Sequence, residues 1–302
     1  MSSNNGTSMR QSPVPCDGDD SWTSGIPYLL FPDDPNRPPS PITNTRDNNI
    51  RLYIHFGLIV FGFLVAVAYF VGQLFQPIPY GRHTSGSGRL PVPVRIAKMV
   101  VALVPNIVFF ILSYFLAGQH FNQAPNIVFF CLYVIHYLER GIVNPLVSRY
   151  SNTKIRLWIP LSWFLTGLLI SYINAEFIGS AEYCNNYLYD PRFLIGLVLF
   201  IVGFALNRVA DYQLVCLRES RTDTKHAIPK GPLYFLISCP NYFGEGLQWF
   251  GWAVMTWSLA GLVLWLVSEA TFVPRSRQNH KWLRNQFLDY PSLRRGLIPF
   301  IF

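Results

Sequence analysis

Seven apolar segments constrain the fold of this 302-residue chain more than any other feature of its sequence. They run roughly over residues 52–75, 96–118, 126–147, 157–174, 192–215, 233–256 and 259–273. The first two are clearly long enough to cross a bilayer core of about 30 Å as helices. Pro105 lies inside the second segment and predicts a kink there. We therefore expect an all-α integral membrane bundle of about seven transmembrane helices.

The charged residues support a membrane location. They make up only 13% of the chain, whereas a soluble domain has about 25%, so much of the protein surface does not face water. The net charge of +8 would suggest a nucleic-acid partner in a soluble protein. Here the basic residues lie in loops between apolar segments, so they indicate membrane orientation and not nucleic-acid binding.

Lys and Arg are distributed unevenly over these loops. If seven segments cross the membrane, loops 76–95, 148–156 and 216–232 lie on the same side as the C-terminal stretch after residue 273. These four stretches hold sixteen Lys and Arg residues, whereas loops 119–125 and 175–191 hold none. The positive-inside rule then places the basic loops and the C-terminus in the cytosol, and the N-terminus in the lumen.

The N-terminal region differs from the rest of the chain. Residues 1–50 are rich in Ser, Asn, Asp and Pro, and the run PDDPNRPPSP at 32–41 cannot form a helix interior. We expect a disordered polar tail over 1–50 and one membrane domain over 51–302. No apolar core follows the first residues, so we expect no cleavable signal peptide, and the first span must act as the targeting signal.

Two common ways of holding a cofactor have no counterpart in the sequence. No GxGxxG follows a predicted strand, so a nucleotide site here must follow a plan other than the Rossmann fold. The five cysteines are scattered, without a CxxC pair or the His/Cys spacing typical of zinc. We interpret them as single buried thiols and expect no metal.

Ionisable residues inside apolar segments are costly in a bilayer and are therefore candidates for function. In the third segment, Tyr137 and Arg140 lie three residues apart and share a helix face. The Tyr137 hydroxyl can donate its proton to a substrate oxygen, and a nearby cation or cofactor would help it to do so. The alternative is an interfacial tyrosine beside a Glu139–Arg140 surface pair.

A second grouping lies in the fifth segment. Asn207, Asp211 and Arg218 occupy positions i, i+4 and i+11 and form one stripe along a helix. Asn and Asp can accept hydrogen bonds from ribose hydroxyls or an amide, and Arg can clamp a phosphate. The alternative is a helix-packing network.

A third grouping lies in the sixth segment, where Asn241 and Glu245 are again four residues apart and follow Pro240. The alternative there is a helix N-terminus whose dipole favours Glu245 in the first turn. The final block, residues 274–302, is basic and ends in LIPFIF. Alone it is typical of a membrane-surface helix that binds anionic lipid, and phosphate binding by some of its arginines is the competing interpretation.

These C-terminal segments carry a recognisable pattern. The stretch 241–261 contains NYFGE, GWAV and TWSLAG, and residues 274–302 contain PR, HKW, DYP and LIPFIF at fixed spacing. The pattern resembles the C-terminal signature of the steroid 5α-reductases, also called 3-oxo-5α-steroid 4-dehydrogenases. Weaker matches upstream are YGRHTS at 80–85, RLP at 89–91, HYLER at 136–140 and N…DY…LR at 207–218. The resemblance covers about residues 80–302.

The resemblance implies an endoplasmic-reticulum protein with seven spans that uses NADPH to reduce a carbon–carbon double bond conjugated to a ketone. It places the cofactor inside the helical bundle beneath cytosolic loops, in agreement with the missing glycine motif. It also implies that Tyr137 hydrogen-bonds the substrate ketone. The positions that it implies for cofactor contacts and functional arginines are Arg149, Asn207, Asp211, Arg218, Asn241, Glu245, Arg275 and Arg294.

The residues aligned with the family's substrate-binding positions depart from the family pattern. The family carries Gln-Glu-Leu/Ser-Pro in its second span, and the Glu works with the tyrosine on the substrate carbonyl. Here the aligned run is ALVP, so Leu103 takes the Glu position, and a family tyrosine of the last block is Leu283. We therefore expect a lipophilic enone other than a simple 3-oxo-Δ4-steroid: a sterol-like, terpenoid or polyketide compound.

The sequence thus predicts a membrane-embedded ene-reductase. Hydride would reach the β-carbon of the enone while Tyr137 stabilises the charge that develops on the carbonyl oxygen. The main alternative is a non-catalytic member of the family that binds cofactor and lipid, with Leu103 marking lost chemistry. A channel or transporter is disfavoured because no span shows a row of pore-lining charges. A membrane methyltransferase that uses S-adenosylmethionine is disfavoured by Tyr137 and the NYFGE run.

Overall fold

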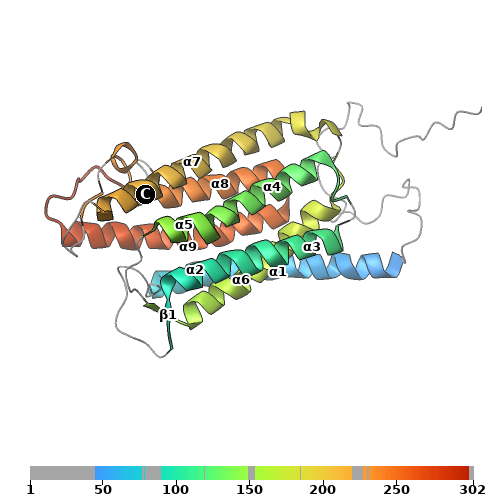
Figure 1. Ribbon diagram of the computed structural model, residues 1–302, viewed down its shortest axis with the longest axis horizontal. Helices are drawn as coiled ribbons and strands as arrows, with labels where there is room; N and C mark the ends of the chain where they lie inside the picture. Colours follow the sequence, from blue (N-terminus) through green and yellow to red (C-terminus); the bar gives the residue numbers. More distant parts are fainter. Residues whose placement is uncertain are drawn as a thin grey trace, which may run out of the picture.

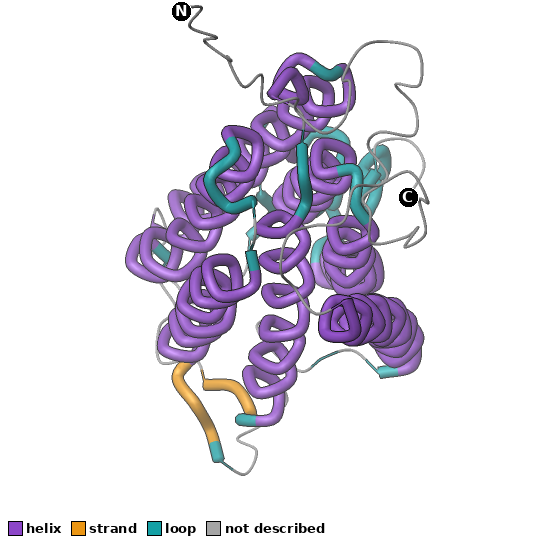
Figure 2. The backbone as a smooth tube through the Cα atoms, turned by 90° about the vertical axis from the view of Figure 1, so that its right-hand side faces the viewer, coloured by secondary structure: helices purple, strands orange, loops and turns teal. Residues whose placement is uncertain are grey.

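The structure of the protein is a computed structural model in which long helices lie side by side (Figure 1). It describes residues 45–76, 78, 90–118, 120–148, 154–183, 185–219, 227–229 and 231–298. Viewed from one end, the helices form a bundle, and two short strands lie at its margin (Figure 2). The predicted N-terminal tail lies outside the described residues up to residue 44, and a helix begins at Thr45.

Each of the seven apolar segments forms a helix. The bounds are α1 Thr45–Phe75; α2 Val94–Leu103, the π-helix η2 Val104–Phe109 and α3 Phe110–Ala117; α4 Ala124–Leu138, the π-helix η3 Glu139–Val143 and α5 Asn144–Val147; α6 Trp158–Ser180; α7 Pro191–Glu219; α8 Pro240–Thr256; and α9 Leu259–Gln286. Strands β1 Pro91–Pro93 and β2 Lys154–Arg156 pair antiparallel, and 3-10 helices cover η4 Asn185–Tyr189 and η5 Pro232–Tyr234. Pro105 lies in η2, where the helix widens into a π-helical stretch.

Five helical stretches of the described chain are long and apolar enough to cross a membrane: 50–75, 94–116, 124–147, 158–180 and 191–217. They confirm the helical membrane-protein class. The expected start of the sixth segment at 233 is wrong, because α8 begins at Pro240 and the preceding Ile237 forms a bridge with Arg295. The seventh segment continues as helix to Gln286, far beyond its apolar part. Membrane crossing by α8 and α9 stays a prediction.

The loops are sorted onto two ends of the bundle. Figure 1 shows β1 at one end of the bundle, close to where α1 and α9 end. There β1 pairs with β2, and Arg275 in the second half of α9 donates to the Ile78 carbonyl that follows α1. At the other end, the Tyr183 backbone N–H donates to Gln123 Oε1 at 3.0 Å. The first end, called the basic end below, gathers the segments that flank the Lys- and Arg-rich loops.

Helices α7 and α8 pack closely against each other at four glycines. Gly196 and Gly203 of α7 face Gly251 and Gly244 of α8, and a Cβ at any of the four would collide with backbone atoms of the opposite helix. On each helix the two glycines are seven residues apart, so they lie on one face after two turns. Small residues at such spacing let the backbones of membrane helices touch.

Candidate functional site

A network of charged side chains lies between η3, α7 and α8, towards the basic end. Arg140 of η3 is at its centre, with Nη1 donating to Asp211 Oδ2 at 3.0 Å and Nη2 donating to Glu245. Asn144 Nδ2 donates to the same oxygen of Asp211 at 3.1 Å. The Arg140, Asp211 and Glu245 side chains are 20%, 20% and 15% exposed, so solvent screens them only in part and the ion pairs restrict their geometry.

Asn207 connects this network to the start of α8. Its Nδ2 donates to the backbone carbonyl of Asn241 at 2.7 Å and to Glu245 Oε2 at 3.3 Å. Four residues that were singled out on two separate helices therefore meet at one place. Glu245 is the sixth residue of α8, and the first turn holds no acidic residue. The alternative that the dipole of the first turn explains Glu245 is therefore wrong.

Arg208 is a second cation in the network, and sequence reasoning missed it. It donates to Glu139 and Asn207, and its Nη2 lies 3.1 Å from Asp211 Oδ2. Glu139 thus pairs with Arg208, so the alternative of a Glu139–Arg140 surface pair is wrong. The i, i+3 spacing of Arg208 and Asp211 was the available signal. Three carboxylates against two guanidinium groups leave the network with one excess negative charge when all are ionised.

Tyr137 of α4 lies one helical turn before Arg140. Its ring centroid is 4.7 Å from that of Tyr133 and 5.9 Å from that of Trp249. Tyr133 and Trp249 are both buried. The Tyr137 hydroxyl therefore belongs to a mostly aromatic environment beside the charged network, where water is sparse and a hydrogen bond to a substrate oxygen is strengthened.

His136 links the surroundings of Tyr137 to α8. It is buried, its Nδ1 is 2.9 Å from Gln248 Nε2, and its Nε2 is 3.9 Å from Glu245 Oε1. Its ring also packs edge-on against Trp249 at 4.4 Å. His136 appeared in the sequence only as part of a motif, and the structure places it between the aromatic and the charged parts of the site.

Leu103 lies at the end of α2, directly against η3. A Cβ built on Gly141 would approach Leu103 Cδ2 to 2.8 Å and Ala102 Cβ to 3.1 Å, so α2 and η3 touch at this glycine. Gly141 follows Arg140 in the chain. Residue 103 is therefore next to the turn that carries the network, and as leucine it presents only apolar surface there.

The two predicted arginines of the C-terminal block are buried and make different contacts. Arg275 is 3% exposed and donates to the Ile78 carbonyl at 2.8 Å. Arg294 is 6% exposed, its guanidinium lies 5.4 Å from the centre of the Tyr290 ring, and its Nε and Nη1 have no hydrogen-bond partner among the described residues. A buried guanidinium with open N–H groups suits an anion such as phosphate.

Two further predicted residues cannot be placed in this geometry. Arg149 lies outside the described residues, and Arg218 belongs to α7 but its side chain is outside the described part. Their roles stay predictions.

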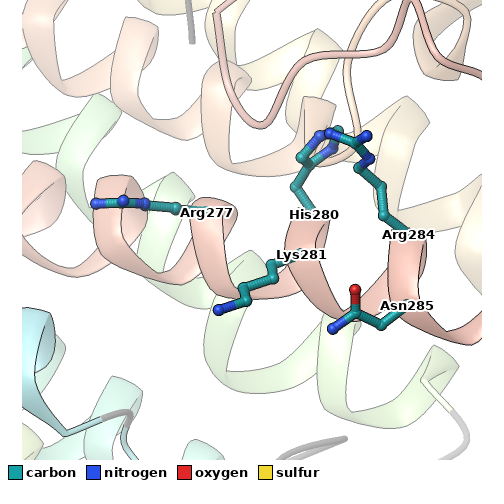
Figure 3. A pocket seen from close by; sticks show the side chains of 5 residues that line it. All are labelled: Arg277, His280, Lys281, Arg284 and Asn285. Carbon is teal, nitrogen blue, oxygen red and sulfur yellow. The ribbon is translucent and has the colours of Figure 1, made fainter.

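The face of α9 that lies opposite the buried Arg275 is exposed and basic. Figure 3 shows the lining of a cavity of about 370 Å³ here, with His280 and Arg284 directed to the same side of the helix: Arg277, His280, Lys281, Arg284 and Asn285. Arg277, Lys281 and Arg284 are exposed, whereas Arg275 is buried. The exposed basic face of α9 and the two buried arginines, Arg275 on α9 and Arg294 beyond its end, are thus separate surfaces for the lipid-binding and phosphate-binding interpretations.

Ser238, in the loop before α8, forms hydrogen bonds with the end of α9 and with the segment that follows it. Its Oγ lies 2.7 Å from His280 Nδ1 and 2.6 Å from Tyr290 Oη, and it donates to the Arg295 carbonyl at 2.9 Å. Burial lowers the pKa of His280, and the cations of Arg284 and Arg295 lower it further. The C-terminal block is therefore attached to the loop before α8 through the Ser238 hydroxyl and through backbone hydrogen bonds of Arg295 with Leu236 and Ser238.

Sequence reasoning also missed Glu269 of α9. Its carboxylate lies against Gly246 and fills the space that a side chain would need there.

Within the described part of the chain, no group of three or more His, Cys, Asp or Glu could hold a metal ion. Cys131, Cys216 and Cys239 form no disulfide among the described residues, and Cys131 is exposed, so the expectation of buried thiols is wrong for it.

Several known proteins are similar in sequence to this chain over most of its length. Residues 151–302 match the family described as 3-oxo-5-alpha-steroid 4-dehydrogenase. A steroid 5-alpha-reductase of Gossypium hirsutum is 34% identical over 255 residues, which cover 82% of this chain and 97% of that protein. A steroid 5-alpha-reductase of Solanum lycopersicum is 36% identical over 263 residues, or 85% and 99% of the two chains. The 3-oxo-5-alpha-steroid 4-dehydrogenase 1 of Bos taurus is 33% identical over 227 residues, or 74% and 87%.

Proposed function

Because the chain belongs to the 3-oxo-5-alpha-steroid 4-dehydrogenase family, we propose that it is a membrane-embedded, NADPH-dependent reductase. The proposed reaction reduces a carbon–carbon double bond conjugated to a ketone in a steroid-like, terpenoid or other lipophilic substrate. The observation that carries the proposal is that four candidate residues meet in one hydrogen-bonded network beside Tyr137, and two of them pair with Arg140 directly. The four are Asn207, Asp211, Asn241 and Glu245.

The distribution of charge suggests which part of NADPH each group of residues would hold. The network around Arg140 has one carboxylate more than it has guanidinium groups, so it disfavours phosphate but accepts hydrogen bonds from an amide or a ribose hydroxyl. Arg294, buried and with open N–H groups, suits the phosphates. We assign Asn207, Asp211, Asn241 and Glu245 to the nicotinamide and its ribose, and Arg149, Arg218, Arg275 and Arg294 to the phosphates. Bound NADPH supplies the hydride.

The excess negative charge also has a chemical use. If NADPH is held here, the carboxylates of Asp211 and Glu245 would favour positive charge at the nicotinamide end of the site. Arg140 holds both carboxylates in position before the reaction begins. Electrostatic groups that are already oriented stabilise a transition state without the cost of reorganisation.

Tyr137 has the complementary role at the substrate. As hydride reaches the β-carbon, negative charge develops on the ketone oxygen, and the Tyr137 hydroxyl donates a hydrogen bond to it. The rings of Tyr133 and Trp249 exclude water and so strengthen that bond. Leu103, against η3, shapes the apolar part of the substrate pocket in this proposal.

We also propose that the protein resides in the endoplasmic-reticulum membrane with its C-terminus in the cytosol. The loop segments that flank the Lys- and Arg-rich stretches meet at one end of the bundle (Figure 1). The loops without Lys or Arg adjoin the contact of Tyr183 with Gln123 at the other end. The contacts of the fold therefore support the positive-inside argument.

A non-catalytic protein that binds cofactor and lipid is the second candidate. Leu103 supports it, because residue 103 contributes no polar group next to the network. The existing pairing of Arg140 with Asp211 and Glu245 supports it too, since these carboxylates are satisfied without a ligand.

Turnover of NADPH by purified protein separates the two functions. We expect oxidation of NADPH in detergent with at least one member of a panel of steroid, terpenoid and polyketide enones. Tyr137→Phe should retain NADPH affinity and lower turnover by roughly 10²-fold or more, because it deletes only the donor. Tight NADPH binding without turnover across the panel would favour the non-catalytic function, and absence of NADPH binding would contradict both.

A further inference from the structure

Contacts between α1 and α9 fix the height of one helix against the other. Gly62 of α1 lies against Val263 of α9, because a Cβ built on Gly62 would approach Val263 Cγ1 to 2.6 Å. Further along, Gln73 Nε2 donates to the Ala270 carbonyl at 3.0 Å, and Gln278 Nε2 donates to the Gln73 carbonyl at 3.0 Å. The residue numbers of the two partners increase together, so the two helices run parallel.

This register shows how far α9 extends past the end of α1. Gln73 is held between residues 270 and 278, whose midpoint is 274. Phe75, the last residue of α1, is two residues further on and is therefore level with Ser276. Helix α9 continues from that level to Gln286, ten residues later, and these residues add about 15 Å. Figure 1 shows α9 extending past the end of α1.

The end of α1 also marks the expected edge of the hydrocarbon layer. Residues 50–75 are one of the candidate membrane spans, and Phe75 at their end is exposed. The polar layer outside the hydrocarbon core is about 5–8 Å thick on each side. Arg277, Lys281 and Arg284 lie one, five and eight residues past the level of Phe75, or about 2, 8 and 12 Å along the helix. The three cations therefore stand at the level of the lipid headgroups and just outside it.

These cations share an open groove on the outer face of α9. Arg277, Lys281 and Arg284 occupy positions i, i+4 and i+7 and form one stripe, and His280 and Asn285 also line the cavity of about 370 Å³ (Figure 3). No acidic side chain is among the described residues of this lining. The three cations also form no ion pair with any residue in the described part of the chain. Their positive charges are thus available to an anion.

We infer that this groove binds the phosphate group of an anionic phospholipid in the leaflet at the basic end. Cations attract anionic headgroups only within about one Debye length, roughly 8 Å at physiological ionic strength, and the register places the groove within that reach. Arg275 and Arg294, which are proposed for the cofactor phosphates, are buried and do not line the groove. The inference rests on the proposed membrane crossing of α9 and does not depend on the enone chemistry.

Binding of short-chain lipids to the full-length protein in neutral detergent tests the groove, with bound lipid counted by native mass spectrometry. Dioctanoyl phosphatidylserine should bind more tightly than dioctanoyl phosphatidylcholine, which has the same chains and phosphate but no net charge. Arg277→Gln, Lys281→Gln and Arg284→Gln should each raise the Kd for phosphatidylserine about fivefold, the contribution of one cation near an anionic lipid surface. Arg284→Lys keeps the charge and should bind as wild type does.

Lys154→Gln is the matched control. Lys154 is an exposed cation of β2 at the same end of the bundle, so its loss changes the net charge equally, and phosphatidylserine binding should not change. Equal binding of the two lipids by wild type, or an equal loss in Lys154→Gln and Arg284→Gln, would overturn the inference.

Two further measurements identify the source of the anion. Inorganic phosphate should not displace phosphatidylserine at comparable concentration, and displacement would assign the groove to free anions instead. The three glutamine variants should keep the NADPH affinity of wild type, whereas a parallel loss would assign the groove to the cofactor and overturn the lipid site. The proposed reductase fails by a different result, namely a wild-type protein that binds no NADPH.

Discussion

Asn207 on α7 donates a hydrogen bond of 2.7 Å from its side chain to the backbone carbonyl of Asn241 on α8. The bond can form because Gly203 and Gly244, close to these residues along each helix, let the two backbones touch. Close helix packing and the candidate cofactor site are therefore parts of one arrangement. A substitution at either glycine should disturb both.

Glu245→Ala and Asn241→Ala should weaken NADPH binding. Loss of a buried hydrogen-bond partner costs about 1–3 kcal/mol, which raises Kd by roughly five- to a hundredfold. Titration of tryptophan fluorescence with NADPH measures the change. Asp190→Asn is the control, because Asp190 pairs with Arg192 at the start of α7, away from the network. Unchanged affinity in both alanine variants would remove this site.

Gly203→Ala should destabilise the protein, because its methyl group would meet the backbone of α8. Overpacking of this kind costs about 1–3 kcal/mol. Gly57→Ala adds the same methyl group where nothing lies within 4 Å, and alanine in a helix is favoured by about 1 kcal/mol over glycine. Thermal unfolding of both variants in one detergent should give a lower Tm for Gly203→Ala only. Equal Tm values would contradict the close α7–α8 contact.

Leu103→Glu should raise the reduction of simple 3-oxo-Δ4-steroids and lower activity on the natural substrate. A carboxyl in this apolar contact stays protonated, since ionising it there costs several kcal/mol. It can then donate a second hydrogen bond to the ketone beside Tyr137. The comparison is NADPH-dependent reduction of testosterone by both proteins, with steroid binding measured separately. Strong testosterone reduction by wild type would contradict the altered-substrate interpretation.

Acidic pH should loosen the C-terminal segment. The pKa of His280 is lower in the folded protein than in the unfolded chain, mainly because it is buried, and also because Arg284 and Arg295 are near. The stability that this difference contributes is therefore complete above about pH 6.5 and is lost as pH falls towards the folded pKa. Protection factors for amide exchange in residues 287–297 should drop between pH 7.5 and 5.5.

His280→Gln supplies the control for that measurement. Glutamine can hydrogen-bond Ser238 but does not titrate, so the variant should lose most of the drop in protection. An equal drop in both proteins would assign the pH dependence to another group.

Membrane orientation can be measured directly in sealed microsomes. A tag after Phe302 should be digested by added protease, and a tag before Met1 should be protected, because the basic loops favour the cytosol. Permeabilised microsomes, in which both tags are digested, control for access. A protected C-terminal tag would reverse the proposed orientation.

The sequence by itself determined the membrane class, the seven helical segments and the family. Apolar run length, loop charge and the spacing of the terminal motif are local properties, and they are visible without a fold. The i, i+4 pairs at Asn207 and Asn241 were likewise visible, since helical spacing alone puts each pair on one face.

Only the tertiary structure decided how these faces meet. Arg140 pairs with Glu245 across 105 positions of the chain, and Glu139 pairs with Arg208 and not with its neighbour. The hydrogen bonds from Tyr133 to Ser171 and on to Asn106 join three separate helical segments. Helical periodicity states which residues share a face, but the partner of a charge or a hydroxyl depends on which helices pack together. That choice is made by shape, above all by the glycines that let α7 and α8 touch.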